Sequence, residues 1–328
     1  MRGAPSATDR AYGDVRRRAL TFATLSLVVV VALAAAFEAH TGMDMERAEQ
    51  LDLLRQVSAA PERFRVIHLP WLVLVGVAAG TFAGLLGMGG GVVKVAGLLV
   101  VFQVDMLLAR AVSLTTMLVA TATAARVHIR SGAVLWQVVR AMALPSVLGA
   151  VGGLALGTLL PRSALEPIFA FFVLFLAFNM LGMIFDDPHE LSLQGRYPKV
   201  LGRSRALLAA GIGGLHGFVC GLLGISGGVI TLPMQQALAR VPARNAVANS
   251  VVVSSICTGV GSTLAVAVGL WQQHFLLRDV LVGTLCIGSG AALGANAGAQ
   301  LTGRVSPSVL KLVFTAVSLA AGASILLR

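Results

Sequence analysis

Residues 87–95, GMGGGVVKV, place glycines and a lysine inside a stretch that is otherwise apolar from Leu69 to Phe102. Glycines at this density interrupt a helix and leave backbone N–H groups without helical partners. Such groups are costly in hydrocarbon unless they line a polar cavity or are bound by protein. A short helix that begins at Gly91 directs its first N–H groups and its positive dipole end toward the break, so the motif predicts a site for an anion.

Lys94 follows in the first turn of this short helix. No Asp or Glu lies in the interior of any apolar span, and a lysine at such a depth normally requires a partner. The substrate itself is therefore a candidate for the missing counter-charge. If the motif lies close to the membrane surface instead, the Lys94 ammonium reaches the interface and has no such role.

The glycine motif occurs twice. Residues 80–93, GTFAGLLGMGGGVV, align without gaps with residues 217–230, GFVCGLLGISGGVI. Two further matches follow in the same order, pairing 111–115 with 246–250 and 149–162 with 290–304. We therefore interpret the chain as a duplication. Interrupted helices at matching positions of two repeated halves indicate a substrate site near the middle of the membrane in secondary transporters.

Polar residues near the two motifs are candidates for lining this site. Ser226 replaces Gly89 in the second copy and offers a hydroxyl beside the break. Thr115, Asn249 and Ser250 fall in the matched downstream segments. For each of these side chains alone, a hydrogen bond to its own helix or to a neighbouring helix is an equal alternative. The predicted substrate-binding residues are Gly89, Gly90, Gly91, Lys94, Thr115, Thr116, Ser226, Gly227, Gly228, Asn249 and Ser250.

Other polar side chains carry chemistry that packing also explains. His216, which precedes the second motif, could relay a proton, but a packed neutral histidine is the competing interpretation. Cys220 within that motif could meet a sulfur substrate, although buried cysteines usually pack as small apolar groups. The remaining polar candidates inside the spans are Gln235 and Asn296.

Composition indicates a membrane protein. Of the 328 residues, 57% are hydrophobic and 12% are charged, and apolar runs occupy nearly the whole length. That pattern is typical of an all-α polytopic membrane protein. The formal net charge of +11 comes from basic residues in short loops between apolar runs. Because such loops orient membrane helices, nucleic acid is not an expected partner.

Enzymatic chemistry has little support in the sequence. The span interiors hold no carboxylate pair, no cluster of metal ligands and no nucleophile with an adjacent base, which are the usual parts of an active site. The glycine motif matches neither a phosphate-binding loop nor a dinucleotide-binding motif. Cys220, Cys257 and Cys286 lie in apolar runs without metal-ligand spacing. We therefore expect no enzyme, no cofactor and no metal.

The apolar runs divide the chain into segments. The N-terminal segment holds an apolar run at Ala19–Phe37, interpreted as a retained transmembrane helix rather than a cleaved signal peptide, and an amphipathic helix at Met45–Val57. Each repeat is expected to contain a long helix that ends at the glycine motif, a short helix and three further spans. The predicted boundaries are 1–69 for the N-terminal segment, 70–185 for repeat 1, 186–204 for a polar cytoplasmic linker and 205–328 for repeat 2.

Two runs of evenly spaced glycines have a different interpretation from the motifs. Gly149, Gly153 and Gly157 form one run, and a second has the same spacing at residues 290–298. Small residues four positions apart allow two membrane helices to approach closely. We therefore assign these glycines to helix packing.

Basic residues predict the orientation of the repeats. If the two helices around each motif enter and leave on the same membrane side, the second repeat is inverted and most Lys and Arg residues share the cytoplasmic side with the N-terminus. If each motif is one broken crossing, the repeats are parallel and the basic residues divide almost evenly. The positive-inside rule therefore favours two inverted repeats with glycine-broken or re-entrant helices. This arrangement counts Arg110 among the residues on the outer side.

The paired motifs resemble those of the sulfite exporter TauE/SafE family. The matches are Gly84–Val92 with Ala111–Thr116 in the first copy and Gly221–Val229 with Ala246–Val251 in the second. The resemblance covers residues 70–328, so the N-terminal helix is additional. It implies movement of sulfite, sulfoacetate or other organosulfonates across a membrane, and of thiosulfate in some relatives.

The sequence thus predicts an exporter of a small sulfur-containing anion in the inner (plasma) membrane. Its N-terminus is expected on the cytoplasmic side, its other contacts are membrane lipid, and a homodimer is left open. An anion channel, or an uptake carrier for thiosulfate or another sulfur compound with the same architecture, is the alternative. Export of an anion from a cell with a negative interior needs no coupling, because each charge gains about 2.3 kcal/mol per 100 mV.

Overall fold

The computed structural model describes residues 68–86, 90–185, 202–301 and 307–327, and all regular elements in these ranges are helices. The expected N-terminal helix, the amphipathic segment and most of the linker lie outside them. The first copy contains α3 (Leu69–Leu86), α4 (Gly91–Val100), α5 (Met106–Arg130), α6 (Trp136–Leu159) and α7 (Arg162–Phe185). The second contains α8 (Arg203–Leu223), α9 (Gly228–Ala237), α10 (Ala243–Trp271), α11 (Leu277–Leu301) and α12 (Pro307–Leu326).

The prediction of an all-α membrane protein is confirmed. In the described ranges, α5, α6, α8, α10 and α11 each contain a stretch long and apolar enough to cross a membrane, and shorter apolar stretches lie in α3, α4, α7 and α12. Trp71, Trp136 and Trp271 are exposed near helix ends. Tryptophan prefers the interface between lipid and water, so these three side chains mark the edges of the apolar band.

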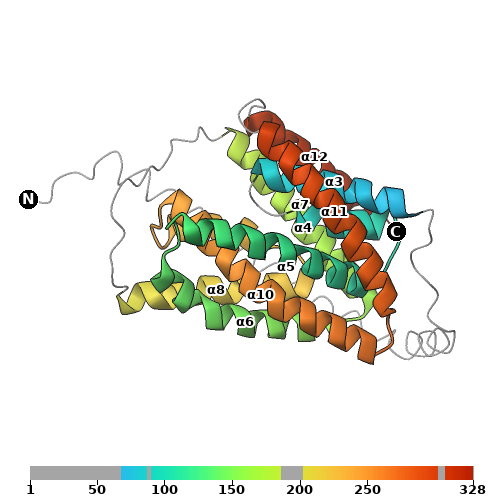
Figure 1. Cartoon of the computed structure of the whole chain (residues 1–328), viewed down its shortest axis with the longest axis horizontal. Helices are drawn as coiled ribbons and strands as arrows, with labels where there is room; N and C mark the ends of the chain where they lie inside the picture. The colour runs from blue at the N-terminus through green and yellow to red at the C-terminus, as the bar shows by residue number, and fades with distance from the viewer. Residues whose placement is uncertain (1–67, 87–89, 186–201, 302–306, 328) are drawn as a thin grey trace, which may run out of the picture.

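The ten described helices pack against one another across the two copies (Figure 1). Each copy runs long, short, long, long, long. The most extensive packing crosses between the copies, because α6 lies along α8 and α11 lies along α3. The two central helices, α5 and α10, also pack together, and the Thr121 and Thr258 hydroxyls meet there at 3.2 Å.

The glycine-spaced packing prediction is confirmed for Gly149 and Gly153, whereas Gly157 makes room for the Arg110 side chain. A side chain at Gly149 would overlap the backbone of Gly214, and one at Gly153 would overlap that of Phe218. The first two glycines of the second run stand in the same relation to α3. Backbones at this separation make many van der Waals contacts, which stabilise helix pairs in lipid. Because later residues of α6 meet later residues of α8, the two helices run in the same direction.

Exposed arginines gather at one end of the α5, α6, α8 and α10 group. The short connection between α5 and α6 brings their ends together, and Asn245 at the start of α10 donates to the Ala133 carbonyl there at 2.7 Å. The described carboxylates start α5, α7 and α11 at the opposite end. The exposed residues of this arginine-rich end are Arg126, Arg130, Arg140, Arg203, Arg205, Arg240 and Arg244.

Candidate functional site

The second glycine motif forms a sharp break between α8 and α9. Helix α8 ends at Leu223, and Gly224 follows with φ of 68° in the left-handed region. Glycine adopts this conformation without the steric cost that other residues incur. The chain then turns through Ile225 and Ser226, both buried, and α9 begins at Gly228.

The first motif leads into α4 in a similar way. Helix α4 begins at Gly91, with Gly90 as its N-cap and no side chain capping it. A side chain at Gly90 would overlap the Ala79 carbonyl of α3. Glycine is therefore needed at Gly90 because the backbone of α3 comes so close. Gly89, also predicted to bind substrate, lies outside the described residues.

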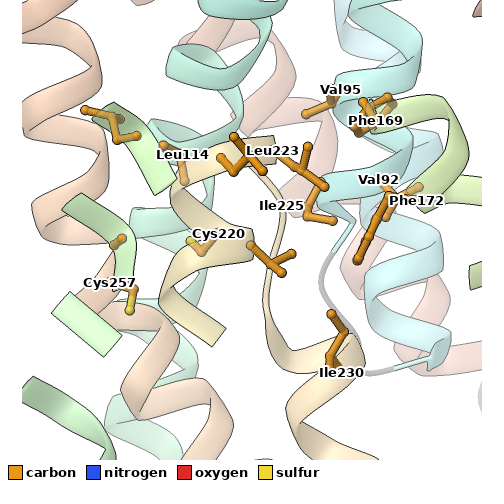
Figure 2. Close-up of a cluster of buried hydrophobic side chains, with 14 of the residues drawn as sticks. Val92, Val95, Leu114, Phe169, Phe172, Cys220, Leu223, Ile225, Ile230 and Cys257 are labelled. Atoms are coloured by element: carbon orange, nitrogen blue, oxygen red, sulfur yellow. The ribbon is translucent and has the colours of Figure 1, made fainter. Parts of the chain in front are cut away.

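The two breaks meet in the interior of the protein. A Cβ atom added to Gly91 would lie 3.1 Å from the Ile225 Cα atom and 3.2 Å from the Ser226 nitrogen. Met117 of α5 completes this contact, with its Sδ atom 3.0 Å from the same position. Figure 2 shows Ile225 beside Val92 of α4. The structure therefore brings the start of α4 in the first copy against the α8–α9 segment of the second.

Lys94 is buried next to this contact. Its side chain is 4% exposed, and Nζ donates to the Thr116 hydroxyl at 3.2 Å. Thr116 uses its own proton on a carbonyl of α5, either Val112 or Ser113. The alternative in which Lys94 reaches the membrane surface is wrong, because the ammonium is enclosed by protein. No ion pair to a carboxylate is recorded for Lys94 within the part of the chain that the structure describes.

The second break is surrounded by a hydrogen-bonded polar network. Ser226 Oγ lies 3.4 Å from Ser254 Oγ, which lies 3.1 Å from His216 Nε2. His216 Nδ1 lies 3.2 Å from Thr231 Oγ1, and Thr231 donates to the Gly227 carbonyl. With the Thr231 proton on the Gly227 carbonyl, His216 Nδ1 donates to Thr231 and Nε2 accepts from Ser254. The network therefore fits one neutral tautomer of His216.

The network continues toward the arginine-rich end. Ser250 Oγ lies 3.2 Å from Thr231 Oγ1 and accepts from Gln235 Nε2 at 2.7 Å. Gln235 Oε1 accepts from Asn249 Nδ2 at 3.2 Å, and Asn249 Oδ1 accepts from the Leu135 amide at 2.8 Å. Each of these polar side chains is buried. The predicted residues Asn249 and Ser250 thus bind α9 and the α5–α6 connection.

The two helix starts differ in how their N–H groups are bound. Ser226 Oγ accepts from the Gly228 amide at 3.3 Å and so partly satisfies the start of α9. The aligned residue in the first copy is Gly89, which has no hydroxyl. An anion at the start of α4 therefore has no hydroxyl of this kind to displace, whereas at the start of α9 it competes with Ser226.

Some predicted residues are placed away from the contact between the breaks. Thr115 donates to the Ala111 carbonyl of its own helix at 2.8 Å and is half-buried. Cys220 and Cys257 lie among buried apolar side chains (Figure 2). The side chain of Asn296 is outside the described residues. The hydrogen bond of Thr115 fits the helix-bonding alternative, and both cysteines pack as small apolar groups.

Sequence reasoning did not select Arg110 or Ser113 as site residues. It counted Arg110 among the residues on the outer side, and the membrane side of this residue stays a prediction. Arg110 lies inside α5 with 1% of its surface exposed. Ser113, one turn later, donates to the Gly224 carbonyl at 2.7 Å. Asp105 was the available signal, because its side chain caps α5 at the Leu108 amide and a helix that starts there includes Arg110.

Comparisons with known proteins place these features in a family. The sequence model described as sulfite exporter TauE/SafE matches residues 72–325. A probable membrane transporter protein MamO of Paramagnetospirillum magneticum is 29% identical in an alignment of 283 residues that covers 77% of this chain and 44% of that protein. MamO of Magnetospirillum gryphiswaldense gives the same values. This chain thus spans less than half the length of these two relatives.

A shorter relative matches along most of its length. A probable membrane transporter protein of Haemophilus influenzae is 28% identical over 256 residues, covering 74% of this chain and 92% of that protein. No solved structure gives a significant match.

Proposed function

Since the chain belongs to the sulfite exporter TauE/SafE family, a family of membrane transporters, we propose that it exports a small sulfur-containing oxyanion. Sulfite and organosulfonates such as sulfoacetate are the proposed substrates. The observation that carries this proposal is the contact between Gly91 and the Ile225–Ser226 segment, with the Lys94 ammonium buried one turn away. An anion at this contact receives N–H groups from the start of α4 and the charge of Lys94.

Lys94 also explains why a charged substrate is favoured over a neutral one. An ammonium group has three donors, and one binds Thr116. A buried cation without a carboxylate raises the free energy of the empty protein, and a bound oxyanion removes that cost. Thr116 orients the Lys94 ammonium through this hydrogen bond. Its role is therefore to position Lys94, and Lys94 is the residue that contacts the substrate.

Transport by alternating access follows from the repeated architecture. The reciprocal pairing of α6 with α8 and of α11 with α3 supports inverted repeats that share one site. In this proposal each glycine break is a point at which backbone can line the passage without a continuous helix. One repeat rocks against the other and exposes the anion to each side in turn.

The arginine-rich end faces the cytoplasm in this proposal. The positive-inside rule places clustered arginines on that side, and the three described carboxylates start helices at the other end. We propose that the protein lies in the inner membrane with its N-terminus in the cytoplasm. The same arginines face the compartment from which the anion is exported and attract it there.

A flux assay in liposomes tests the proposal. The purified chain is reconstituted, and efflux of sulfite, sulfoacetate, taurine, thiosulfate and sulfate is measured for the wild type and for Lys94→Met, which keeps the length of the side chain without the charge. We expect sulfite or sulfoacetate to move faster than in empty liposomes and the variant to lose most of this flux. Thr115→Val is the matched control, because its hydroxyl binds only its own helix.

The same preparation separates a carrier from a channel. A carrier accelerates uptake of labelled anion when unlabelled anion is present on the opposite side, whereas a channel gives flux that does not saturate. Binding without flux would identify a sensor, and no flux of any anion in the panel would refute the proposal. If thiosulfate alone moves, and moves inward, the uptake alternative replaces export.

A further inference from the structure

Arg110 is a second buried cation, and three of its five N–H donors have no recorded hydrogen-bond partner among the described residues. Its side chain is 1% exposed. Nη1 lies 3.5 Å from the Leu154 carbonyl and 3.4 Å from the Gly221 carbonyl. Both distances are long for hydrogen bonds. Nε is buried and has no hydrogen-bond partner, and none is recorded for Nη2 among the described residues.

The unused atoms form one edge of the guanidinium group. Nε and Nη2 direct two parallel N–H bonds to the same side, in the geometry that matches two oxygens of a carboxylate, sulfonate or sulfite. Nη1 alone holds the carbonyls of α6 and α8. Arg110 is therefore anchored through one nitrogen while its bidentate edge is left without an acceptor from the described protein.

Two glycines make room for this side chain. A Cβ atom at Gly157 would overlap Nη1, and one at Gly224 would lie 2.8 Å from the Arg110 Cα and Cγ atoms. Gly224 also requires glycine for its positive φ. The end of α8 and the last turns of α6 are thus shaped around Arg110.

The charge of Arg110 is not balanced by the described protein. The structure records no ion pair between Arg110 and a described carboxylate, and its two acceptors are neutral carbonyls. The C-terminal end of α8 supplies a partial negative charge, which is less than the full charge of a guanidinium. A buried cation in this state is costly unless a ligand anion neutralises it.

Arg110 lies on the face of α5 that also contacts both breaks. Ser113 binds Gly224 of the second break, Thr116 binds Lys94, and Met117 contacts Gly91 of the first. Spacings of three and four residues place these side chains on one helix face. Six residues separate Arg110 from Thr116, a rise of about 9 Å. Both cations thus lie along the face of α5 that meets the contact between the breaks.

We propose that Arg110 forms a second binding site for the transported oxyanion. The edge formed by its Nε and Nη2 atoms binds two oxygens of the anion. The inference rests on the proposed function and adds a residue to the path. The anion moves between Lys94 and Arg110 along the α5 face while the repeats change orientation. The anion can then leave one cation while the other already binds it, which lowers the free-energy cost of leaving either cation.

Arg110→Lys is the discriminating variant, because it retains the charge and removes the bidentate edge. Loss of a charge-assisted pair of hydrogen bonds predicts a rise in the KM for sulfite or sulfoacetate of about 10- to 100-fold. Arg110→Met is expected to do the same and to remove the second of two binding events for radiolabelled sulfite. Arg140→Lys, at the exposed arginine-rich end, is the matched control and should leave both measurements unchanged.

The outcomes separate this inference from the proposed function. Thermal unfolding and size-exclusion chromatography first show that each variant folds. If folded Arg110→Lys transports with the wild-type KM and keeps both binding events, Arg110 only ties α5 to α6 and α8, and the inference fails while transport stands. If the wild type neither binds nor moves the anions, the proposed function itself fails. A rise in KM that Arg140→Lys reproduces also overturns the inference, since the effect is then not specific to the guanidinium group of Arg110.

Discussion

The first and second glycine breaks have aligned sequences, but the polar side chains around them differ. Where the second break has His216 and Thr231, the first has Ala79 and Lys94. His216 and Thr231 bind each other in a closed network, whereas Lys94 has one hydroxyl partner. The two breaks therefore begin their short helices at aligned glycines but have different side chains around them. We infer that the first break binds the anion and the second is the framework against which it binds.

The glycines show the same division. Gly90 is required by the Ala79 carbonyl, and Gly227 is required by His216, which occupies the aligned position. Close approach of α3 to α4, and of α8 to α9, is therefore common to both copies. Counted from the first residues of α5 and α10, Ser113 aligns with Ser250, rather than with Ala248 as the sequence match gave. Ser113 donates to the Gly224 carbonyl at the break of the other copy, whereas Ser250 accepts from Gln235 in the short helix of its own copy.

Moving the charge from one break to the other should have the largest effect. Thr231→Lys places a cation where the side chain is fully buried and breaks the bonds to Gly227, His216 and Ser250. An unpaired buried charge costs about 3–5 kcal/mol, so we expect little folded protein by size-exclusion chromatography. Lys94→Thr should fold normally and lose transport. Normal folding and flux of Thr231→Lys would show that the two breaks are interchangeable.

A methyl group at each helix start gives the next largest contrast. In Gly91→Ala the new carbon meets the Met117 sulfur and the backbone of Ile225 at 3.0–3.1 Å, so the two breaks must separate. In Gly228→Ala it meets only the Ser226 hydroxyl, at 3.2 Å. We expect Gly91→Ala to reduce sulfite flux at least about tenfold, a change of about 1.4 kcal/mol, and Gly228→Ala to retain most of it. Equal losses would mean that the contact is not special to the first break.

Removing His216 should affect stability more than transport. His216→Leu leaves Ser254 without its acceptor and Thr231 without one donor, inside a buried network. An unsatisfied buried polar group costs about 1–3 kcal/mol, which a thermal unfolding scan in detergent detects as a lower transition. His128→Leu is the control, because His128 is half-buried in the last turn of α5. If His216→Leu melts like the wild type but loses flux, the proton-relay hypothesis for His216 gains over a structural role.

The sequence predicted the elements well because their signals are local. The helix starts at Gly91 and Gly228, the duplication and the small-residue packing of Gly149 and Gly153 all follow from spacing along one segment. Family membership followed from the same motifs. The orientation of the two copies in the membrane stays a prediction, because it rests on the charge distribution rather than on spacing.

The partners of the buried polar groups could not be predicted in the same way. Arg110 meets carbonyls of α6 and α8, and His216 meets Ser254 of α10. The pairing of Arg110 with Gly221 joins helices of different copies, and the other two pairings join separate helices within one copy. No periodicity reports such a contact. Asn249 was singled out as a site residue, but its partners Gln235 and the Leu135 amide became visible only in three dimensions.

The smallest effect should come from making the second break more like the first. Ser226→Gly removes the hydroxyl that accepts from the Gly228 amide and meets Ser254, and a lost cap costs about 0.5–2 kcal/mol. The start of α9 then has N–H groups free for an anion, as the start of α4 does. We therefore expect a slightly lower melting transition together with tighter sulfite binding by equilibrium dialysis. Weaker binding would instead indicate that the Ser226 hydroxyl contacts the anion, which would make the second break part of the binding surface rather than its support.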